Sequence, residues 1–394
     1  MSSIQPGYIA KSTSEFSPIP KTPNDKKRLA FLDALRGLAA AYVIVYHMLL
    51  IPQPNLMAPK WIETFAMSGG TGVTLFFVIS AFSLCYTMPL RLKEKYPIRL
   101  FYLHRFFRIA PLFYCWIAAT LIRDIATTNY LHPLAEVIAS ITFLFNFVPN
   151  GQSGFVWASW TIGVEMIFYA LFPFIYNYVK TIKHAIIFVF LCLIFWLLIK
   201  AILIQLTMPS DYKQSILQFS TFKYFPGFAM GILVYHLYKL FESLHLNSLK
   251  CRIYGSIIVC CAIVAFAMLL LGWLIMPSLF GTDSPYYAQS LIYGLLLLGF
   301  SLSPWSLFIN AMSNYFGKIS FSMYLSHPSV VYFLTPVYTW LYQNMPNLTI
   351  SFLCSLLITF LIVIFISDFT YRFIEKPGII LGHKMANRLL TETK

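Results

Sequence analysis

The chain is dominated by apolar runs, separated by short polar segments, that are long enough to cross a bilayer. An α-helix needs about 20 predominantly apolar residues to span the hydrocarbon core. On that criterion we predict about ten transmembrane helices. They are expected at residues 33–51, 72–89, 108–126, 155–179, 185–206, 219–238, 253–274, 286–303, 318–340 and 350–374. The predicted fold class is therefore an all-α, polytopic integral membrane protein.

The segments between and outside these spans are short. The apolar stretch 134–149 ends at Pro149, so we interpret it as a re-entrant or interfacial piece rather than an eleventh crossing. Residues 1–28 are polar and lack the apolar core of a cleavable signal peptide, so we expect a disordered cytoplasmic tail. A membrane domain over 29–377 and a short basic cytoplasmic tail over 378–394 complete the predicted organisation.

Composition supports the same class. Hydrophobic residues make up 59% of the chain and charged residues only 11%, whereas a soluble domain carries about a quarter charged residues. The seven cysteines lie in or beside apolar runs without metal-ligand spacing, so we expect buried small side chains and no metal site.

The net charge of +14 is explained by topology rather than by nucleic-acid binding. If the N-terminus is cytoplasmic, 23 of the 28 Lys and Arg fall on inner segments or inner span ends. The exceptions are Lys60, Arg123, Lys200, Lys213 and Lys223. The positive-inside rule therefore predicts an even number of spans with both termini cytoplasmic.

Ionisable side chains inside spans are costly and mark functional sites by default. In the first span, Arg36 and His47 are eleven residues apart and share one helical stripe, about 16 Å apart along the axis. Asp33 lies one turn before Arg36 and is expected to fix it by an ion pair. We predict that Arg36 lies near the cytoplasmic end and His47 towards the outer half.

Two further groups lie in the middle of the chain. Arg105 and Arg108 form a basic entry to the third span, suited either to phosphate oxygens or to anionic lipid head groups. Glu165 is a lone carboxylate inside a span, flanked by Trp160 and Tyr169, and it has no evident structural partner in the sequence.

The last two groups lie towards the C-terminus. Tyr324 and His327 share a helical face in the ninth predicted span, and Pro328 there indicates a kink around a cavity. Arg372 and Glu375 are expected on one face near the cytoplasmic end, either in the site or as a structural ion pair.

Six motifs occur in an order that resembles the acyltransferase-3 family of membrane acyltransferases, which O-acylate bacterial surface glycans and related acceptors. They are FLDALRG followed by His47, TLFFVISAF at 74–82, HRFFRIAP, WTIGVEMIFY, GKISFSMYLSHP and RFIEKP. The resemblance extends over residues 29–377. It departs from the family at Ala81, usually glycine, and at His104, usually basic, and it lacks the frequent outer hydrolase-like domain.

The resemblance implies ten helical spans and acyl transfer from cytoplasmic acyl-CoA, most simply acetyl-CoA, to a hydroxyl reached from the outer side. It implies catalytic roles for His47, Glu165 and Arg36, and donor binding by Arg105 and Arg108 together with Arg36. Asp33, Tyr324, His327, Arg372 and Glu375 would support them.

The expected reaction defines the partners and the location. His47 would act as general base or as a transient acyl carrier, with Glu165 orienting its imidazole or a proton relay. Acyl-CoA is expected as a substrate, with no permanently bound cofactor; the acceptor would be a glycan or lipid-linked sugar, in contact with membrane lipids of a bacterial inner membrane. The alternatives are a proton-coupled transporter or flippase, since intramembrane His and Glu also serve proton relays, and a purely structural membrane protein.

Overall fold

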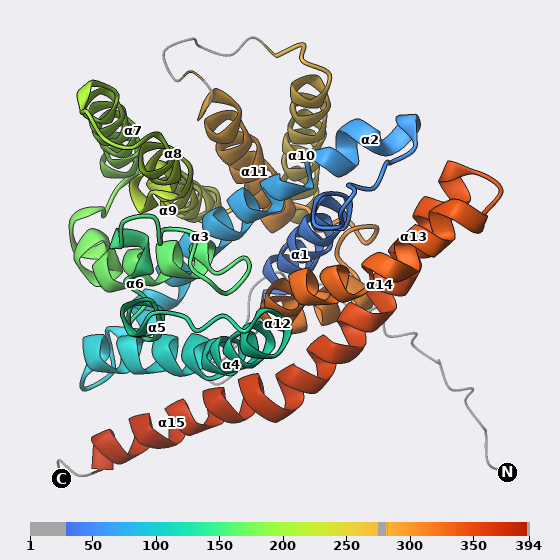
Figure 1. Ribbon diagram of the computed structural model, residues 1–394. Helices are drawn as coiled ribbons and strands as arrows, with labels where there is room; N and C mark the ends of the chain where they lie inside the picture. Colours follow the sequence, from blue (N-terminus) through green and yellow to red (C-terminus); the bar gives the residue numbers. More distant parts are fainter. Residues whose placement is uncertain (1–28, 275–280, 282, 392–394) are drawn as a thin grey trace, which may run out of the picture.

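The computed structural model describes residues 29–274, 281 and 283–391, and these residues form helices and loops without a β-strand (Figure 1). The first half contains α1 (Ala30–Leu50), α2 (Lys60–Met67), α3 (Gly72–Arg91), α4 (Pro97–Thr128), α5 (Leu134–Ile141), α6 (Trp160–Tyr178), α7 (Ile182–Gln205) and α8 (Ser210–Phe219). The second half contains α9 (Thr221–Ser243), α10 (Ser248–Leu270), α11 (Ser284–Leu302), α12 (Ala311–Phe333), α13 (Thr335–Asn344), α14 (Leu348–Thr370), a π-helical turn (Tyr371–Glu375) and α15 (Lys376–Thr391). Short 3₁₀ turns lie at Gly69–Thr71 and Phe145–Phe147.

The all-α polytopic fold class is confirmed, and a helix underlies each predicted span. The span predicted at 318–340 was too long at its C-terminal end, because α12 ends at Phe333 and a separate helix, α13, begins at Thr335. Among the described residues, six helices are long and apolar enough to cross a membrane: α1, the α2–α3 stretch, α4, α7, α10 and the α14–α15 stretch. The other four expected spans are α6, α9, α11 and α12. Helix α12 shows why such a helix is more polar: it turns Ser320, Ser322, Ser326 and His327 into the protein interior. Ten crossings with both ends inside stay a prediction.

The segments outside the spans are now placed. The stretch predicted at 134–149 forms α5 and a 3₁₀ turn, each far too short to cross a bilayer. The predicted tail 1–28 lies outside the described residues. The predicted basic tail 378–394 is helical as far as Thr391, and Gly378 and Gly382 in it let α15 lie directly against α4.

Helix α1 lies in the middle of the bundle, packed against α3 and α12 (Figure 1). At its crossing with α12 the two backbones touch. A Cβ at Gly317 would lie 1.8 Å from the Asp33 carbonyl oxygen, and one at Gly37 would lie 2.5 Å from the Ser313 carbonyl oxygen. Small residues allow this approach in membrane helix pairs. The crossing fixes how the polar stripe of α1 faces the polar side of α12.

The remaining helices surround this pair. An aromatic stack joins α3, α9 and α6: the Phe77 and Phe228 ring centroids are 4.6 Å apart, and those of Phe228 and Phe168 are 4.0 Å apart. By contrast, only 17% of the most apolar stretch of α7 is buried inside the protein, and the same fraction of α10. Both helices expose large apolar side chains such as leucine and isoleucine. An apolar outer surface of this kind suits lipid contact rather than water.

Candidate active site

Two histidines from α1 and α12 form a hydrogen-bonded pair. His327 Nε2 lies 2.9 Å from His47 Nδ1, and the His327 side chain is completely buried. The sequence placed His47 on the polar stripe of its helix and His327 on a shared face with Tyr324. The structure brings these two stripes together through the close crossing at Gly317.

The hydrogen-bond network assigns the protons of this pair. His327 Nδ1 lies 3.2 Å from the Met323 carbonyl oxygen, which can only accept, so this nitrogen carries the hydrogen. In a neutral ring the other nitrogen is then an acceptor, and His47 Nδ1 donates to it. His47 Nε2 is left with its lone pair, as a general base requires.

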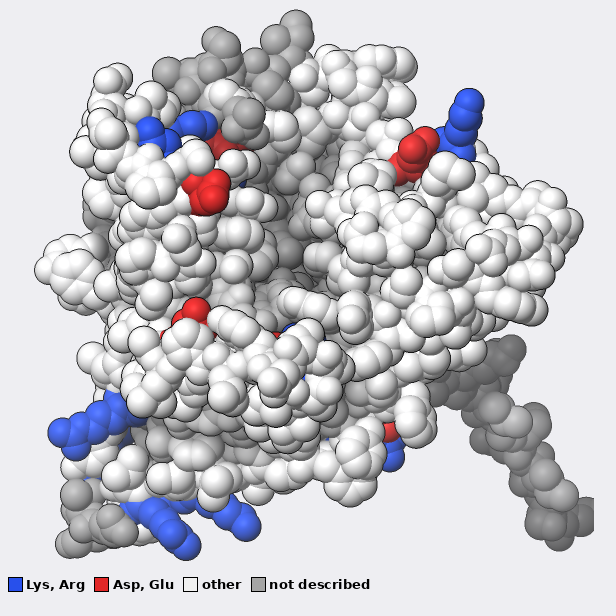
Figure 2. Space-filling view, in the orientation of Figure 1, with Lys and Arg blue, Asp and Glu red and all other residues white. Residues whose placement is uncertain are grey.

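His47 lines a large cavity of about 940 Å³, which we call the outer cavity. Figure 2 shows the molecule hollowed here, between the side of α8 and α9 and the side of α2. Its wall is rich in aromatic and hydroxyl side chains, including Trp157, Trp160, Tyr224 and Tyr286. Pockets of roughly 300–1,000 Å³ hold small organic ligands, so this one has room for a sugar.

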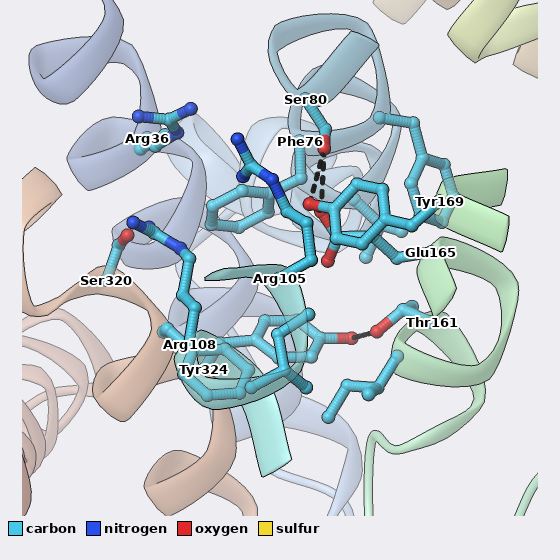
Figure 3. A pocket seen from close by; sticks show the side chains of 15 residues that line it. Arg36, Phe76, Ser80, Arg105, Arg108, Thr161, Glu165, Tyr169, Ser320 and Tyr324 are labelled. Atoms are coloured by element: carbon cyan, nitrogen blue, oxygen red, sulfur yellow. Dashed lines mark hydrogen bonds between the residues drawn. The ribbon is translucent and has the colours of Figure 1, made fainter. Parts of the chain in front are cut away.

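A second, narrower cavity of about 80 Å³, the inner cavity, lies among α1, α3, α4, α6 and α12 (Figure 3). Three guanidinium groups line it, those of Arg36, Arg105 and Arg108, against the single carboxylate of Glu165. In Figure 2, lysine and arginine side chains also project over the start of α4 and over α15, the edge opposite the hollow. The structure thus brings together the arginines that the sequence singled out on two separate helices.

The three arginines differ in how they are held. Arg36 is fixed as predicted, by Asp33 at 3.5 Å, and it also donates to Ser83 Oγ at 2.8 Å. Arg105 stacks on the rings of Phe101 and Tyr169, and within the described residues its buried Nε has no hydrogen-bond partner. A buried N–H without a protein partner is uncommon, and this one is free to donate to a bound acceptor. An anion with several oxygens fits this position.

Glu165 lies in the inner cavity rather than beside His47. Its Oε1 accepts hydrogen bonds from Ser80 Oγ at 2.7 Å and from the Tyr169 hydroxyl (Figure 3). The side chain hydrogen-bonded to the His47 imidazole is His327, so Glu165 does not orient that ring by direct contact, and its part in a proton relay stays a prediction. Glu165 instead holds Tyr169, on which Arg105 stacks, and it balances part of the positive charge of the cavity.

The two cavities meet at Val73 and Tyr324, which line both of them. The Tyr324 hydroxyl accepts a hydrogen bond from Thr161 Oγ1 at 3.0 Å (Figure 3). Its ring centroid lies 5.6 Å from that of His327. The cationic cavity therefore ends one side chain away from the histidine pair.

The C-terminal residues are not brought together as expected. The chain is π-helical from Tyr371 to Glu375, which shifts the register of the face. Arg372 is exposed and forms an ion pair with Asp368 at 2.7 Å, whereas Glu375 is 2% exposed and accepts a hydrogen bond from Ser322 Oγ. Glu375 supports α12 from within the core, while Arg372 lies on the surface.

Sequence reasoning missed the hydroxyl partners of the site: Ser80, Ser83, Thr161 and Ser322. Ser80 lies in the motif TLFFVISAF, which the sequence analysis had already identified. Tyr169 follows Glu165 by one helical turn, so their contact could have been predicted from the spacing. No spacing indicates that Ser322 would meet Glu375. In the part of the chain that the structure describes, no group of three or more His, Cys, Asp or Glu could hold a metal ion.

Comparison with known proteins identifies a family for the chain. A family model described as an acyltransferase domain, of the acyltransferase-3 type, matches residues 29–368. No curated protein matches the chain, and no solved structure does. The matched range contains the histidine pair and the arginine-lined cavity but ends before Arg372 and Glu375.

Proposed function

The chain belongs to the acyltransferase-3 family of membrane acyltransferases, and from that premise we propose that it transfers an acetyl group from cytoplasmic acetyl-CoA to a hydroxyl of a cell-surface glycan or glycolipid. The observation that carries the proposal is the meeting of two unlike cavities at Tyr324. One is narrow and cationic, as an anionic donor requires, and the other is wide and contains a histidine base.

The donor binds through its phosphates. Arg105 and Arg108 offer guanidinium groups with few competing carboxylates, and Arg36 adds a third on the facing helix. Guanidinium groups form forked hydrogen bonds to phosphate oxygens. With the phosphates held at the arginines, the donor is oriented with its thioester end towards Tyr324 and the histidine pair.

Transfer then needs one base and no permanently bound cofactor. His47 Nε2 removes the proton of the acceptor hydroxyl, whose oxygen attacks the thioester carbonyl carbon. The tetrahedral intermediate collapses, the C–S bond breaks, and the thiolate leaves with the proton from His47 as free CoA. His327 accepts the hydrogen bond from His47 Nδ1 throughout, so the imidazolium formed during the reaction is stabilised.

The acceptor binds in the outer cavity. Aromatic faces such as Trp157 and Trp160, among hydroxyl and amide groups, suit the alternating apolar and polar faces of a sugar ring. We place the protein in the bacterial inner membrane, with the donor entering from the cytoplasm and the acceptor from the outer face.

The proposal is tested on the glycans of intact cells. Mass spectrometry compares surface glycans from cells that make the wild-type protein with those from cells that make His47→Ala at the same level. We expect wild-type glycans to be heavier by one acetyl group per modified unit. Equal glycan masses in the wild-type and His47→Ala samples would contradict the proposed acetyl transfer. A transporter would instead change the amount of exported glycan without changing its mass.

A further inference from the structure

The two cavities share two lining side chains. Val73 on α3 and Tyr324 on α12 are the residues that the described linings of both cavities share. Val73 is 7% exposed and Tyr324 is 6% exposed. Any group that passes from the arginines to His47 must therefore pass, or stop at, these two side chains.

Tyr324 is held in place from three directions. Thr161 on α6 bonds to its hydroxyl at 3.0 Å. The Phe76 ring on α3 meets the tyrosine ring edge to face, with centroids 5.8 Å apart. On its own helix, Tyr324 lies one turn before His327, with ring centroids 5.6 Å apart. A ring held in this way is a fixed wall rather than a loose side chain.

The sizes of the two cavities differ by an order of magnitude. The inner cavity has about 80 Å³ and the outer cavity about 940 Å³. A protein cavity of about 150 Å³ holds one benzene molecule. The inner cavity is smaller than that, so against Tyr324 it has room only for a group of few heavy atoms. Its deep end is closed by Tyr324.

We infer that Tyr324 is a specificity-determining residue: its ring closes the deep end of the inner cavity and restricts the transferred group to a short acyl chain. The inference rests on the proposed function, because it needs an acyl thioester in the inner cavity. A two-carbon acyl group stops at the ring with its carbonyl near the histidine pair. A longer chain would have to displace the ring, break its bond to Thr161 and intrude on Phe76.

Equilibrium binding tests the inference without a known acceptor. Purified protein in lipid nanodiscs is titrated with acetyl-CoA and with hexanoyl-CoA by isothermal titration calorimetry. We expect the wild-type protein to bind acetyl-CoA at least tenfold more tightly than hexanoyl-CoA. In Tyr324→Ala this preference for acetyl-CoA over hexanoyl-CoA should fall at least tenfold. The space left by the ring buries methylene groups of the hexanoyl chain, and each buried methylene strengthens binding of the longer chain.

Matched variants separate the ring from other effects. Tyr324→Phe keeps the ring and should keep most of the discrimination. Tyr332→Ala makes the same change at a tyrosine that lines the outer cavity alone, and it should leave the ratio unchanged. If Tyr324→Ala does not fold, Val73→Ala replaces it, with a smaller shift expected in the same direction.

The outcomes differ for the two proposals. Wild-type protein that binds both thioesters equally, or a folded Tyr324→Ala (or Val73→Ala in its place) with an unchanged ratio, overturns the role of Tyr324 and leaves the acyltransferase proposal standing. Wild-type protein that binds neither thioester overturns both.

Discussion

The hydrogen bond between His327 and His47 makes the sharpest prediction about catalysis. In His327→Leu the acceptor for His47 Nδ1–H disappears, while a buried side chain of similar size remains. The donor then loses its side-chain acceptor, at a cost of about 1–3 kcal/mol. If that cost falls on the transition state, kcat decreases by roughly 5- to 150-fold.

A polar replacement should rescue this loss. In His327→Gln the amide oxygen can accept the hydrogen bond of His47 Nδ1, so the ring keeps its orientation and its proton pattern. We expect kcat of this variant within about tenfold of wild type, on the scale of changes to groups that orient catalytic residues. The KM for acetyl-CoA should change little in both variants, because the arginines that bind the donor line the other cavity.

The assay follows labelled acetyl transfer from acetyl-CoA to endogenous glycan in inverted membrane vesicles. Protein levels and melting temperatures are matched beforehand. The double variant His47→Ala, His327→Leu should be no slower than His47→Ala alone, because the second change acts through the first residue. An equal loss of kcat in His327→Leu and His327→Gln, or full activity in His327→Leu, would refute the role given to His327.

Three further predictions follow from the site and the fold. Arg105→Gln and Arg108→Gln should each raise the KM for acetyl-CoA by roughly 10- to 150-fold, since a charge-assisted hydrogen bond contributes about 1.5–3 kcal/mol; an unchanged KM in steady-state kinetics would show that the phosphates bind elsewhere. Gly317→Ala should lower the melting temperature far more than Gly294→Ala, because the new methyl group meets the Asp33 backbone at 1.8 Å rather than the flexible Met230 at 3.0 Å; equal melting temperatures by differential scanning fluorimetry would contradict the close crossing. In the loop before α11, burial opposes ionisation of Asp283, but hydrogen bonds from Trp196 and Lys200 and the charge of Lys223 outweigh it and hold its pKa below the usual 3.8. The stability that Asp283 contributes is therefore complete above that pH and is lost as the pH falls through the lower folded-state pKa, so melting temperatures of wild type and Asp283→Asn should converge between pH 5 and pH 2; a constant difference would rule out this linkage.

The helices and the main polar stripes could be predicted because they depend on local patterns. Apolar runs located every long helix of the described chain, and the eleven-residue spacing of Arg36 and His47 correctly placed both on one side of α1. The ion pair of Asp33 with Arg36 is a contact within one helical turn, so the sequence was sufficient to predict it.

Contacts between distant helices could not be predicted in the same way. Glu165 was expected to orient the His47 imidazole or a proton relay, but its carboxylate accepts a hydrogen bond from Ser80 on α3, a contact between distant helices that the sequence did not indicate. The separation of Arg372 from Glu375 depends on one π-helical turn, which no sequence pattern predicted. The partner of His47 depends on how closely α1 and α12 approach, and Gly37 and Gly317 permit that approach without specifying the register.

The most direct test of the account is the fate of a labelled acetyl group supplied on the cytoplasmic face. Inverted vesicles receive acetyl-CoA labelled in the acetyl group, and label in lumenal glycan is followed for wild type and His47→Gln at equal protein levels. The account predicts labelled glycan with wild type and a rate at least 100-fold lower with His47→Gln, the lower end of the range for loss of a general base. Equal labelling by the two proteins, or no labelled glycan with wild type, would contradict it.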